Sequence, residues 1–189
     1  MALTKSVSTR TSPAYAISGD FCRIFAQDMN SLYLLSFLLT ADREKAEQCF
    51  VSGLGDSLNA NRIFREWARS WARRAVIQNA IRMIQPTTHA AGKAPLPAIN
   101  TASAASQGDA LFSAVLELGA FERFVFVMSV LEHYSDQDCS LLLGCSRRAV
   151  ALAKMRAAEG IARFAESGKS TAARGPAAFD QRRWIAQSA

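Results

Sequence analysis

The stretch that decides the fold is SDQDCSLLLGCSRRAVALAKMRA, from Ser135 to Ala157. Its spacing is typical of a helix-turn-helix, which needs a small residue where two helices cross, a turn that tolerates unusual backbone angles, and buried apolar positions on both helices. Ser140 is small at the crossing, and Gly144 stands where a positive φ costs least. The positions that the motif would bury are Cys139, Leu143, Cys145, Val150 and Ala153. An ordinary helical hairpin that ends its first helix at Gly144 is the alternative.

Two serines are placed to begin these helices. Ser135 can cap the first helix, with Asp138 three residues later in the place of a capping-box acid, and Ser146 can cap the second. Arg147 and Arg148 open the second helix, at the end that would enter a DNA groove in this motif. The pattern predicts two cations presented to a polyanion.

Composition narrows the class of protein. The 189 residues carry 22 Lys and Arg against 16 Asp and Glu, a net charge of +6 with a pI near 9.5, which favours an anionic partner. No apolar run approaches the roughly 18 residues that a membrane span needs. The first twenty residues lack the apolar centre of a secretory signal. We therefore expect a cytoplasmic protein with no membrane partner.

Cysteine and histidine positions favour neither a metal site nor catalysis. The four cysteines are scattered, without a Cys-x-x-Cys pair, and are expected to be small apolar core residues: Cys22, Cys49, Cys139 and Cys145. His89 and His133 have no close ligand neighbours, and no nucleophile accompanies His133. We expect no enzyme activity, no catalytic residue, no metal or other cofactor, and no small-molecule substrate.

Apolar periodicity predicts three helical segments in the N-terminal half. Apolar residues recur at three- and four-residue steps from Asp20 to Leu39, along one helix. Thr40 and Asp42 indicate a break and a new cap, and the Gly-Leu-Gly at 53–55 should bend or end the second helix. A third segment is expected from about Asn59 to Met83.

The third segment concentrates positive charge beside aromatic rings. It has one acid, Glu66, and these arginines: Arg62, Arg65, Arg69, Arg73, Arg74 and Arg82. Phe64, Trp67 and Trp71 line one side of it. Such rings either form core or, beside arginines, hold unstacked bases and phosphates. We expect the rings to be core, whereas the arginines fit a solvated face and a nucleic-acid surface equally well.

The overall expectation is an all-α protein of two small helical domains joined by a flexible linker, the C-terminal one a helix-turn-helix of winged-helix-like type. Residues 85–109 hold three of the five prolines and no hydrophobic periodicity, which is typical of a linker. The expected parts are a flexible arm (1–19), a helical domain (20–84), the linker (85–109), the helix-turn-helix domain (110–166) and a loose basic tail (167–189). Within the tail, Phe179 to Gln187 has the pattern of a short basic amphipathic helix.

This order of parts resembles a bacterial RNA polymerase sigma factor of the sigma-70 family, in the small extracytoplasmic-function group. In the C-terminal half the matching residues of the family's fourth region are Leu118, Glu122, Arg123, Phe124 to Met128, Ser135, Leu143, Gly144, Ser146, Val150, Arg156 and Ala157. In the N-terminal half, where the match is more degenerate, the second region is echoed by Tyr33, Thr40, Asp42, Ala46, Glu47, Phe50, Trp67, Ala72, Arg73 and Arg82.

The resemblance implies a protein that directs an enzyme rather than being one. Its second region would bind the clamp of core RNA polymerase and bases of the melted promoter, and its fourth region would read promoter DNA. By position, the fourth-region contacts to DNA would be Ser146, Arg147, Arg148, Ala151, Lys154 and Met155, and the second-region contacts Arg65, Arg69, Arg73 and Arg74. The polymerase contacts would be Ala46, Glu47 and Phe50.

Two departures from the family pattern keep alternatives open. The usual Gln-Glu-hydrophobic-Phe of the clamp-binding helix is eroded after Glu47, and the usual Thr-Val-Lys of the reading helix is Ala149-Val150-Ala151. One alternative is a sigma-like module that binds an anti-sigma factor without reading DNA. The other is a helix-turn-helix regulator that dimerises through its helical half.

Overall fold

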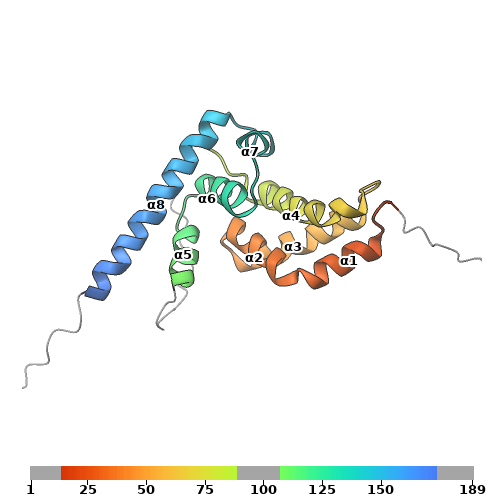
Figure 1. Cartoon of the computed structure of the whole chain (residues 1–189), viewed down its shortest axis with the longest axis horizontal. Coiled ribbons are helices and arrows are strands. Elements are labelled where there is room, and N and C mark those ends of the chain that lie inside the picture. Colours follow the sequence, from red (N-terminus) through yellow and green to blue (C-terminus); the bar gives the residue numbers. More distant parts are fainter. Residues whose placement is uncertain (1–13, 89–106, 174–189) are drawn as a thin grey trace, which may run out of the picture. The chain divides into compact units, whose positions relative to one another are not determined.

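A computed structural model describes residues 14–88 and 107–173. In these residues the regular secondary structure is helical, apart from one isolated bridge between Tyr15 and Phe64 (Figure 1). The expected all-α class is confirmed. The chain divides into two compact units, one of Met1–Thr87 with Leu141–Gly144, the other of Thr88–Ser140 and Cys145–Ala189.

Between residues 14 and 87, the N-terminal unit contains four α-helices and one short 3-10 turn. They are α1 (Ser18–Gln27), α2 (Met29–Thr40), α3 (Arg43–Leu58), η1 (Arg65–Trp67) and α4 (Ala68–Ile84). The single helix expected from Asp20 to Leu39 is therefore wrong. The chain leaves helical geometry at Asp28, where φ is −100° and ψ is 17°, and a new helix begins at the next residue. Both helices keep their apolar faces toward the core, which is why the periodicity did not reveal the break.

Helix α3 runs without a break through Gly53 and Gly55, contrary to the expected bend. Gly53 is needed because α3 packs closely on α4: a Cβ there would lie 2.9 Å from Cγ2 of Val76 and 3.3 Å from its Cα. The buried seam between the two helices consists of small residues, namely Ala46, Cys49, Gly53 and Ser57 on α3 and Ala72, Ala75, Val76 and Ala80 on α4. Close approach of the helices, rather than flexibility, explains Gly53.

Buried hydroxyl groups in this core bond within their own helices. Ser36 donates to the carbonyl oxygen of Leu32 at 2.9 Å, Thr40 to that of Ser36 at 2.9 Å, and Ser57 to that of Gly53 at 2.8 Å. Each bond satisfies a polar group that burial would otherwise leave at a cost.

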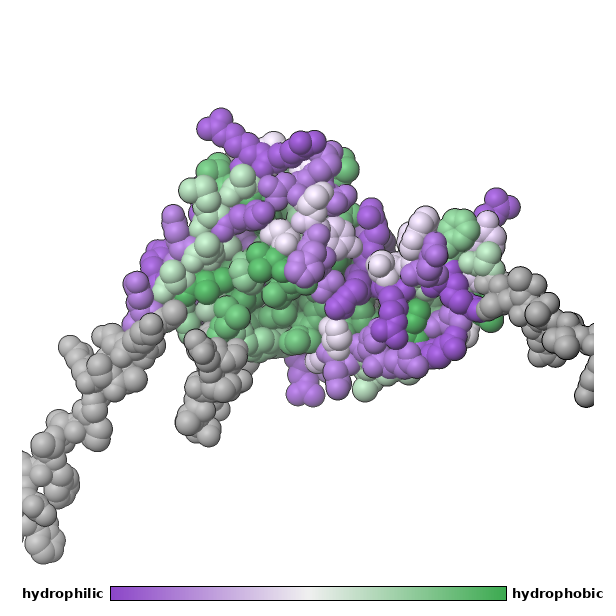
Figure 2. Space-filling view, in the orientation of Figure 1, coloured by the Kyte–Doolittle hydropathy of each residue, from purple (hydrophilic) through white to green (hydrophobic). Residues whose placement is uncertain are grey.

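The C-terminal unit contains α5 (Gln107–Leu116), α6 (Ala120–Phe126), a π-helical turn η2 (Val127–Leu131), α7 (Asp136–Leu143) as far as Ser140, and α8 (Arg147–Ala173). Helix α8 packs on α5 and α6 through a face of small residues, Val150, Ala153, Ala157 and Gly160. A Cβ on Gly160 would lie 2.8 Å from Cδ2 of Leu118, so the leucine side chain would have to shift to admit it. Figure 2 shows hydrophobic residues gathered on the visible surface around α5.

The buried guanidinium of Arg123 caps the C-terminal end of α5. Its Nη1 donates to the carbonyl oxygens of Leu118 at 3.1 Å and Leu116 at 3.5 Å. Burial lowers the pKa of this guanidinium to about 10, so it stays charged at neutral pH. Arg123, which the resemblance placed among the matched residues, thus has a packing and capping role.

The expected boundaries hold only in part. Helix α5 begins at Gln107, within the expected linker. Helix α8 continues to Ala173, so the loose tail expected from residue 167 is wrong for residues 167–173. Residues 1–13 of the expected arm, the linker from 89 to 106 with His89, and the segment from Phe179 to Gln187 lie outside the described residues. Within the described ranges, no helix combines the length and apolar character that a membrane crossing requires.

Candidate nucleic-acid interface

Helices α7 and α8 meet at the predicted turn. Gly144 has a φ of +62°, a region that favours glycine. The Cys145 N–H donates to the carbonyl oxygen of Ser140 at 3.0 Å and holds the turn closed. Cys139, Val150 and Ala153 are buried as predicted, whereas Leu143 and Cys145 are half-buried. Residues 135–157 thus form two helices joined by a turn at Gly144, an arrangement that fits both a helix-turn-helix and an ordinary helical hairpin.

Both predicted serine caps are present. The backbone N–H of Asp138 donates to Oγ of Ser135 at 3.1 Å, and that of Ala149 donates to Oγ of Ser146 at 3.2 Å. The Asp138 carboxylate accepts from the Ser135 hydroxyl at 2.5 Å. The caps fix the start of each helix, and therefore the place where Arg147 and Arg148 emerge.

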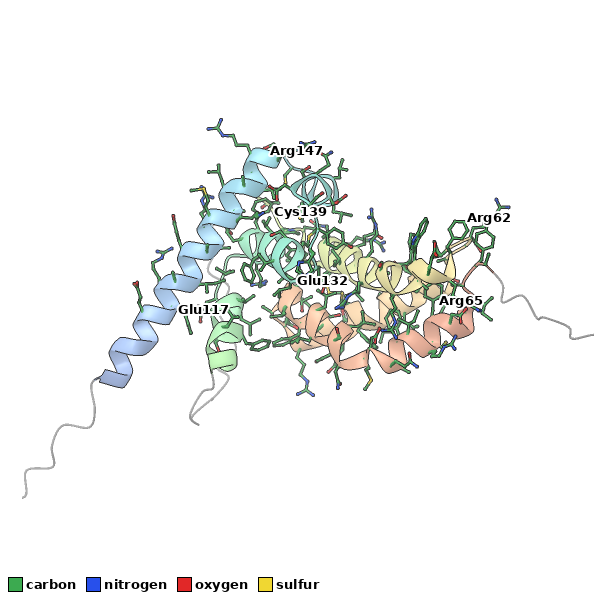
Figure 3. All side chains as sticks on the ribbon, in the orientation of Figure 1. Arg62, Arg65, Glu117, Glu132, Cys139 and Arg147 are labelled. Atoms are coloured by element: carbon green, nitrogen blue, oxygen red, sulfur yellow. The ribbon has the colours of Figure 1, made fainter. Side chains whose placement is uncertain are left out.

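Two side chains of α8 are bonded back to α7. Arg147 Nε donates to Oε1 of Gln137, and Lys154 Nζ lies 3.0 Å from Oδ1 of Asp136. These bonds hold α8 in a fixed orientation against α7. They also occupy two of the cations that the resemblance assigned to DNA, although Arg147 remains exposed at the beginning of α8 (Figure 3).

One face of α8 points away from the side that packs on α5 and α6. This face begins with the cation Arg148 and continues with apolar residues. Arg148 is exposed and forms no ion pair with any residue in the described ranges. Ala151 is exposed, and the exposed fraction of Met155 is 60% and that of Leu152 is 43%. The structure therefore places Ser146, Arg147, Arg148, Ala151 and Met155 together on the surface, as a reading face would require.

The four arginines of the N-terminal unit that the resemblance assigned to DNA differ from this pattern, because three of them bond residues of other elements. Arg65 pairs with Asp20 at 3.0 Å, Arg69 Nη1 with Asp28 at 3.2 Å, and Arg73 donates to Oγ of Ser31 at 3.1 Å. These bonds fasten η1 and α4 to α1 and α2. Arg74 is exposed and has no such bond within the part of the chain that the structure describes.

Three aromatic rings form an exposed cluster at one end of the N-terminal unit, which we call the aromatic cluster: Tyr15, Phe64 and Trp67. Tyr15 stacks on Phe64 with centroids 5.0 Å apart, and Phe64 meets Trp67 edge to face at 5.1 Å. Their exposed fractions are 45%, 39% and 58%, so the core role expected of Phe64 and Trp67 is wrong. Phe64 and Trp67 precede α4. Phe64 forms a β-bridge with Tyr15, so this segment lies against Tyr15 and does not pack in the core.

Sequence reasoning missed Tyr15, since no periodicity links it to position 64. The Ala16 N–H donates to the Ile63 carbonyl at 2.7 Å, and the Arg65 N–H to that of Ala14 at 3.0 Å. Arg62 stands in the same loop, exposed and with a φ of +59° (Figure 3). Trp71 is half-buried, and its Nε1 has no hydrogen-bond partner in the described residues. The cluster thus combines open rings with a cation beside them.

The three residues assigned to polymerase lie on α3 in different environments. Ala46 is fully buried and packs in the core. Phe50 is half-buried and meets Phe25 edge to face at 5.3 Å. Glu47 is exposed and pairs with Arg43 at 3.3 Å. Of the three, Glu47 is the side chain most open to a partner.

The cysteines behave as predicted at two positions. Cys49 and Cys139 are fully buried, and desolvation raises the pKa of each thiol to about 11. Cys145 is half-buried with a raised pKa from the same cause, and Cys22 is exposed, so a core role is wrong for Cys22. The described residues contain no group of His, Cys, Asp and Glu placed to hold a metal ion.

No protein-family model, curated protein or solved structure matches this chain. Function must therefore be inferred from the residues of the chain itself.

Proposed function

We propose that the chain is a sigma-factor-like transcription initiation protein that binds core RNA polymerase and promoter DNA. The observation that carries the proposal is the start of α8, where Arg147 and Arg148 are exposed soon after the turn at Gly144 that joins α7 to α8. The unpaired N–H groups of a helix start also attract phosphate. The net charge of +6 fits a polyanionic partner.

In this proposal the first two turns of α8 lie in the major groove. Arg148 is the principal reader, because its guanidinium is free of ion pairs within the described ranges and suits the bidentate edge of guanine. Ala151 and Met155 offer apolar contact, as to a thymine methyl group. Lys154 and the Gln137-bonded Arg147 chiefly orient the helix, with Arg147 reaching the backbone phosphates.

The aromatic cluster supports a second contact, with unpaired bases. Open rings next to Arg62 can stack on bases without reading their sequence. Arg74 is the candidate phosphate contact in this unit, while Arg65, Arg69 and Arg73 hold its helices together. The clamp of core polymerase would meet the exposed side of α3 at Glu47 and the edge of Phe50.

The test is holoenzyme formation and DNA binding. Purified protein is passed over immobilised core polymerase at low salt, and a random double-stranded DNA pool is then selected with the resulting complex. We expect a retained complex, and a DNA affinity that falls steeply as salt rises. Absence of any complex at low salt would refute the polymerase role.

Substitution of Arg148 tests the DNA role separately. Arg148→Glu should abolish selection of a preferred sequence and flatten the salt dependence, because a reader and a cation are both lost. Lys45→Glu makes the same change of charge at an exposed position of α3 and is the matched control. Equal DNA binding by the two variants would contradict the assignment of α8 as the reading helix.

A second candidate, a sigma-like module that binds an anti-sigma factor, is favoured by the exposed Leu152 and Met155. It predicts a stable complex with such a protein and no salt-dependent DNA binding. The third candidate, a helix-turn-helix regulator, requires a stable homodimer and a pseudopalindromic site, with both reading helices left uncovered.

A further inference from the structure

Helix α8 has a second regular face opposite the one that packs on α5 and α6. Its members alternate by four and three residues and are all exposed: Arg148, Leu152, Met155, Glu159, Ala162 and Glu166. The packing face, with Val150, Ala153 and Ala157, lies on the other side of the helix. Alternation by four and three is the spacing with which one helix meets another along its length. We call these six residues the outer seam.

The charges of the outer seam are arranged asymmetrically along the helix. Arg148 is at its beginning, and Glu159 and Glu166 are in its second half. None of these three forms an ion pair with another residue in the part of the chain that the structure describes. The seam is therefore open, and its two ends have opposite charge.

Position 157 is the midpoint of the seam. If two copies of α8 lie antiparallel about this point, Arg148 faces Glu166 of the second copy, and Leu152 faces Ala162. Met155 then faces Glu159, whose methylene groups a flexible thioether can cover while the carboxylate stays in water. A parallel pair would instead set Arg148 against Arg148 and Glu166 against Glu166. The charge pattern thus selects one orientation.

We propose that the outer seam docks a second copy of this chain, with two α8 helices antiparallel about a two-fold axis. Such an interface is isologous, so each favourable contact occurs twice. The apolar area on offer is small, with Leu152 and Met155 as the large members, which makes the dimer a weak one that forms as concentration rises.

The dimer covers Arg148, Leu152 and Met155, the same face that we assigned to DNA. Self-association and DNA binding then exclude each other, and the protein binds DNA as a monomer. This regulatory consequence rests on the proposed function, whereas the dimer itself does not. It also differs from the dimer of a helix-turn-helix regulator, which leaves the reading helices uncovered.

Sedimentation velocity of the full chain over a range of concentrations tests the dimer. We expect the unmodified protein and Lys45→Glu to shift together from monomer toward dimer. Arg148→Glu should weaken association by about tenfold, because two exposed pairs are lost per dimer and replaced by repulsions of similar size. The double variant Arg148→Glu with Glu166→Arg restores opposite charges and should restore association. Circular dichroism checks that each variant keeps its helices.

The double variant also separates this inference from the proposed function. It should regain the dimer but not DNA binding, since no cation stands at position 148. A monomer at every concentration, or a double variant no more associated than Arg148→Glu alone, would overturn the dimer even if DNA binding is found. A dimer that behaves as expected in a protein without DNA binding would leave the inference standing and remove the proposed function.

Discussion

Arg65 donates two hydrogen bonds to one carboxylate oxygen of Asp20, from Nε at 3.2 Å and from Nη2 at 3.0 Å, across 45 residues of sequence. The same carboxylate accepts the Ile17 N–H at 3.1 Å, at the start of α1, and pairs with Arg23. The Ile17 hydrogen bond and the two arginines hold the pKa of buried Asp20 below its ordinary value of 3.8. One side chain thus caps α1 and fastens it to η1.

The pH dependence of stability follows from this carboxylate. Because the folded pKa is below the unfolded one, the stabilisation is fully present above the ordinary value of 3.8 and is lost as pH falls toward the lowered value. Asp20→Asn should therefore lower the midpoint of thermal unfolding at pH 7, and the difference from the unmodified protein should shrink near pH 3. Thermal unfolding at a series of pH values measures it. A difference that stays constant with pH would assign the loss to packing instead.

Gly53 and Gly55 offer a matched pair of substitutions on one helix. Gly53→Ala should destabilise the protein by about 1–3 kcal/mol, because the added methyl meets Val76 and the backbone of α4. Gly55→Ala has nothing within 4 Å and should gain up to about 1 kcal/mol from helix propensity. Denaturant unfolding of both variants gives the two free energies. Equal effects would contradict close packing at Gly53.

Gly144 is expected to be the most sensitive position of the turn between α7 and α8. Gly144→Ala should cost about 1–2 kcal/mol, since a Cβ is disfavoured at a φ of +62° although space around it is open. Gly144→Asn should cost less, because asparagine adopts this conformation more readily. Denaturant unfolding of the two variants checks the order, and the reverse order would exclude a conformational cause.

The two helices α7 and α8 and the turn between them were predictable because their signals are local. A serine cap, a glycine at positive φ and the apolar spacing around them act within a few residues, so Ser135, Gly144 and Ser146 are found where the sequence indicated. The break at Asp28 was not predictable, since both helices bury the same side and the apolar pattern continues across it.

The rest depended on contacts distant in sequence. The sequence predicted a helix break near Gly53, because the close contact of Gly53 with Val76 on α4 has no local signal. It predicted a core role for Phe64 and Trp67, because nothing local shows that Phe64 pairs with Tyr15 at the surface. The sequence left open whether the arginines form a solvated face or a nucleic-acid surface. In the structure, Arg65 forms an ion pair with Asp20 and Arg69 with Asp28. Residue pairs of this kind have no signature in a single sequence.

The aromatic cluster gives a direct prediction for single-stranded DNA. Trp67→Ala should weaken binding of a short single-stranded oligonucleotide by about 1–3 kcal/mol if one base stacks on this ring. Met29→Ala, an equally exposed apolar residue without a ring, is the control, with exposed fractions of 53% for Met29 and 58% for Trp67. Fluorescence anisotropy of a labelled oligonucleotide measures both. Equal affinities would show that the cluster does not hold bases.

Thiol reactivity should separate the four cysteines. Cys22 is exposed and should react first with a disulfide reagent in the folded protein, whereas Cys49 and Cys139 should react only on unfolding, because they are buried and their pKa values are about 11. Cys22→Ser should remove the fast phase in a stopped-flow or absorbance assay. A fast phase that survives in a variant with both Cys22→Ser and Cys145→Ser, which removes the half-buried thiol as well, would mean that the core opens readily.

Hydroxyl groups that bond to the preceding turn of their own helix have a consequence for how the N-terminal unit tolerates change. Thr40 also bonds to the Asp42 carbonyl and Ser36 to the Cys49 thiol of α3, whereas Ser57 bonds to the Gly53 carbonyl of its own helix. The neighbours of Ser57 are therefore constrained in size rather than in chemistry. Ser57→Ala removes the donor and the acceptor of the hydroxyl together and leaves no orphaned group across the bundle. A library randomised at position 57 would keep small apolar residues and discard large ones, a selection by volume alone.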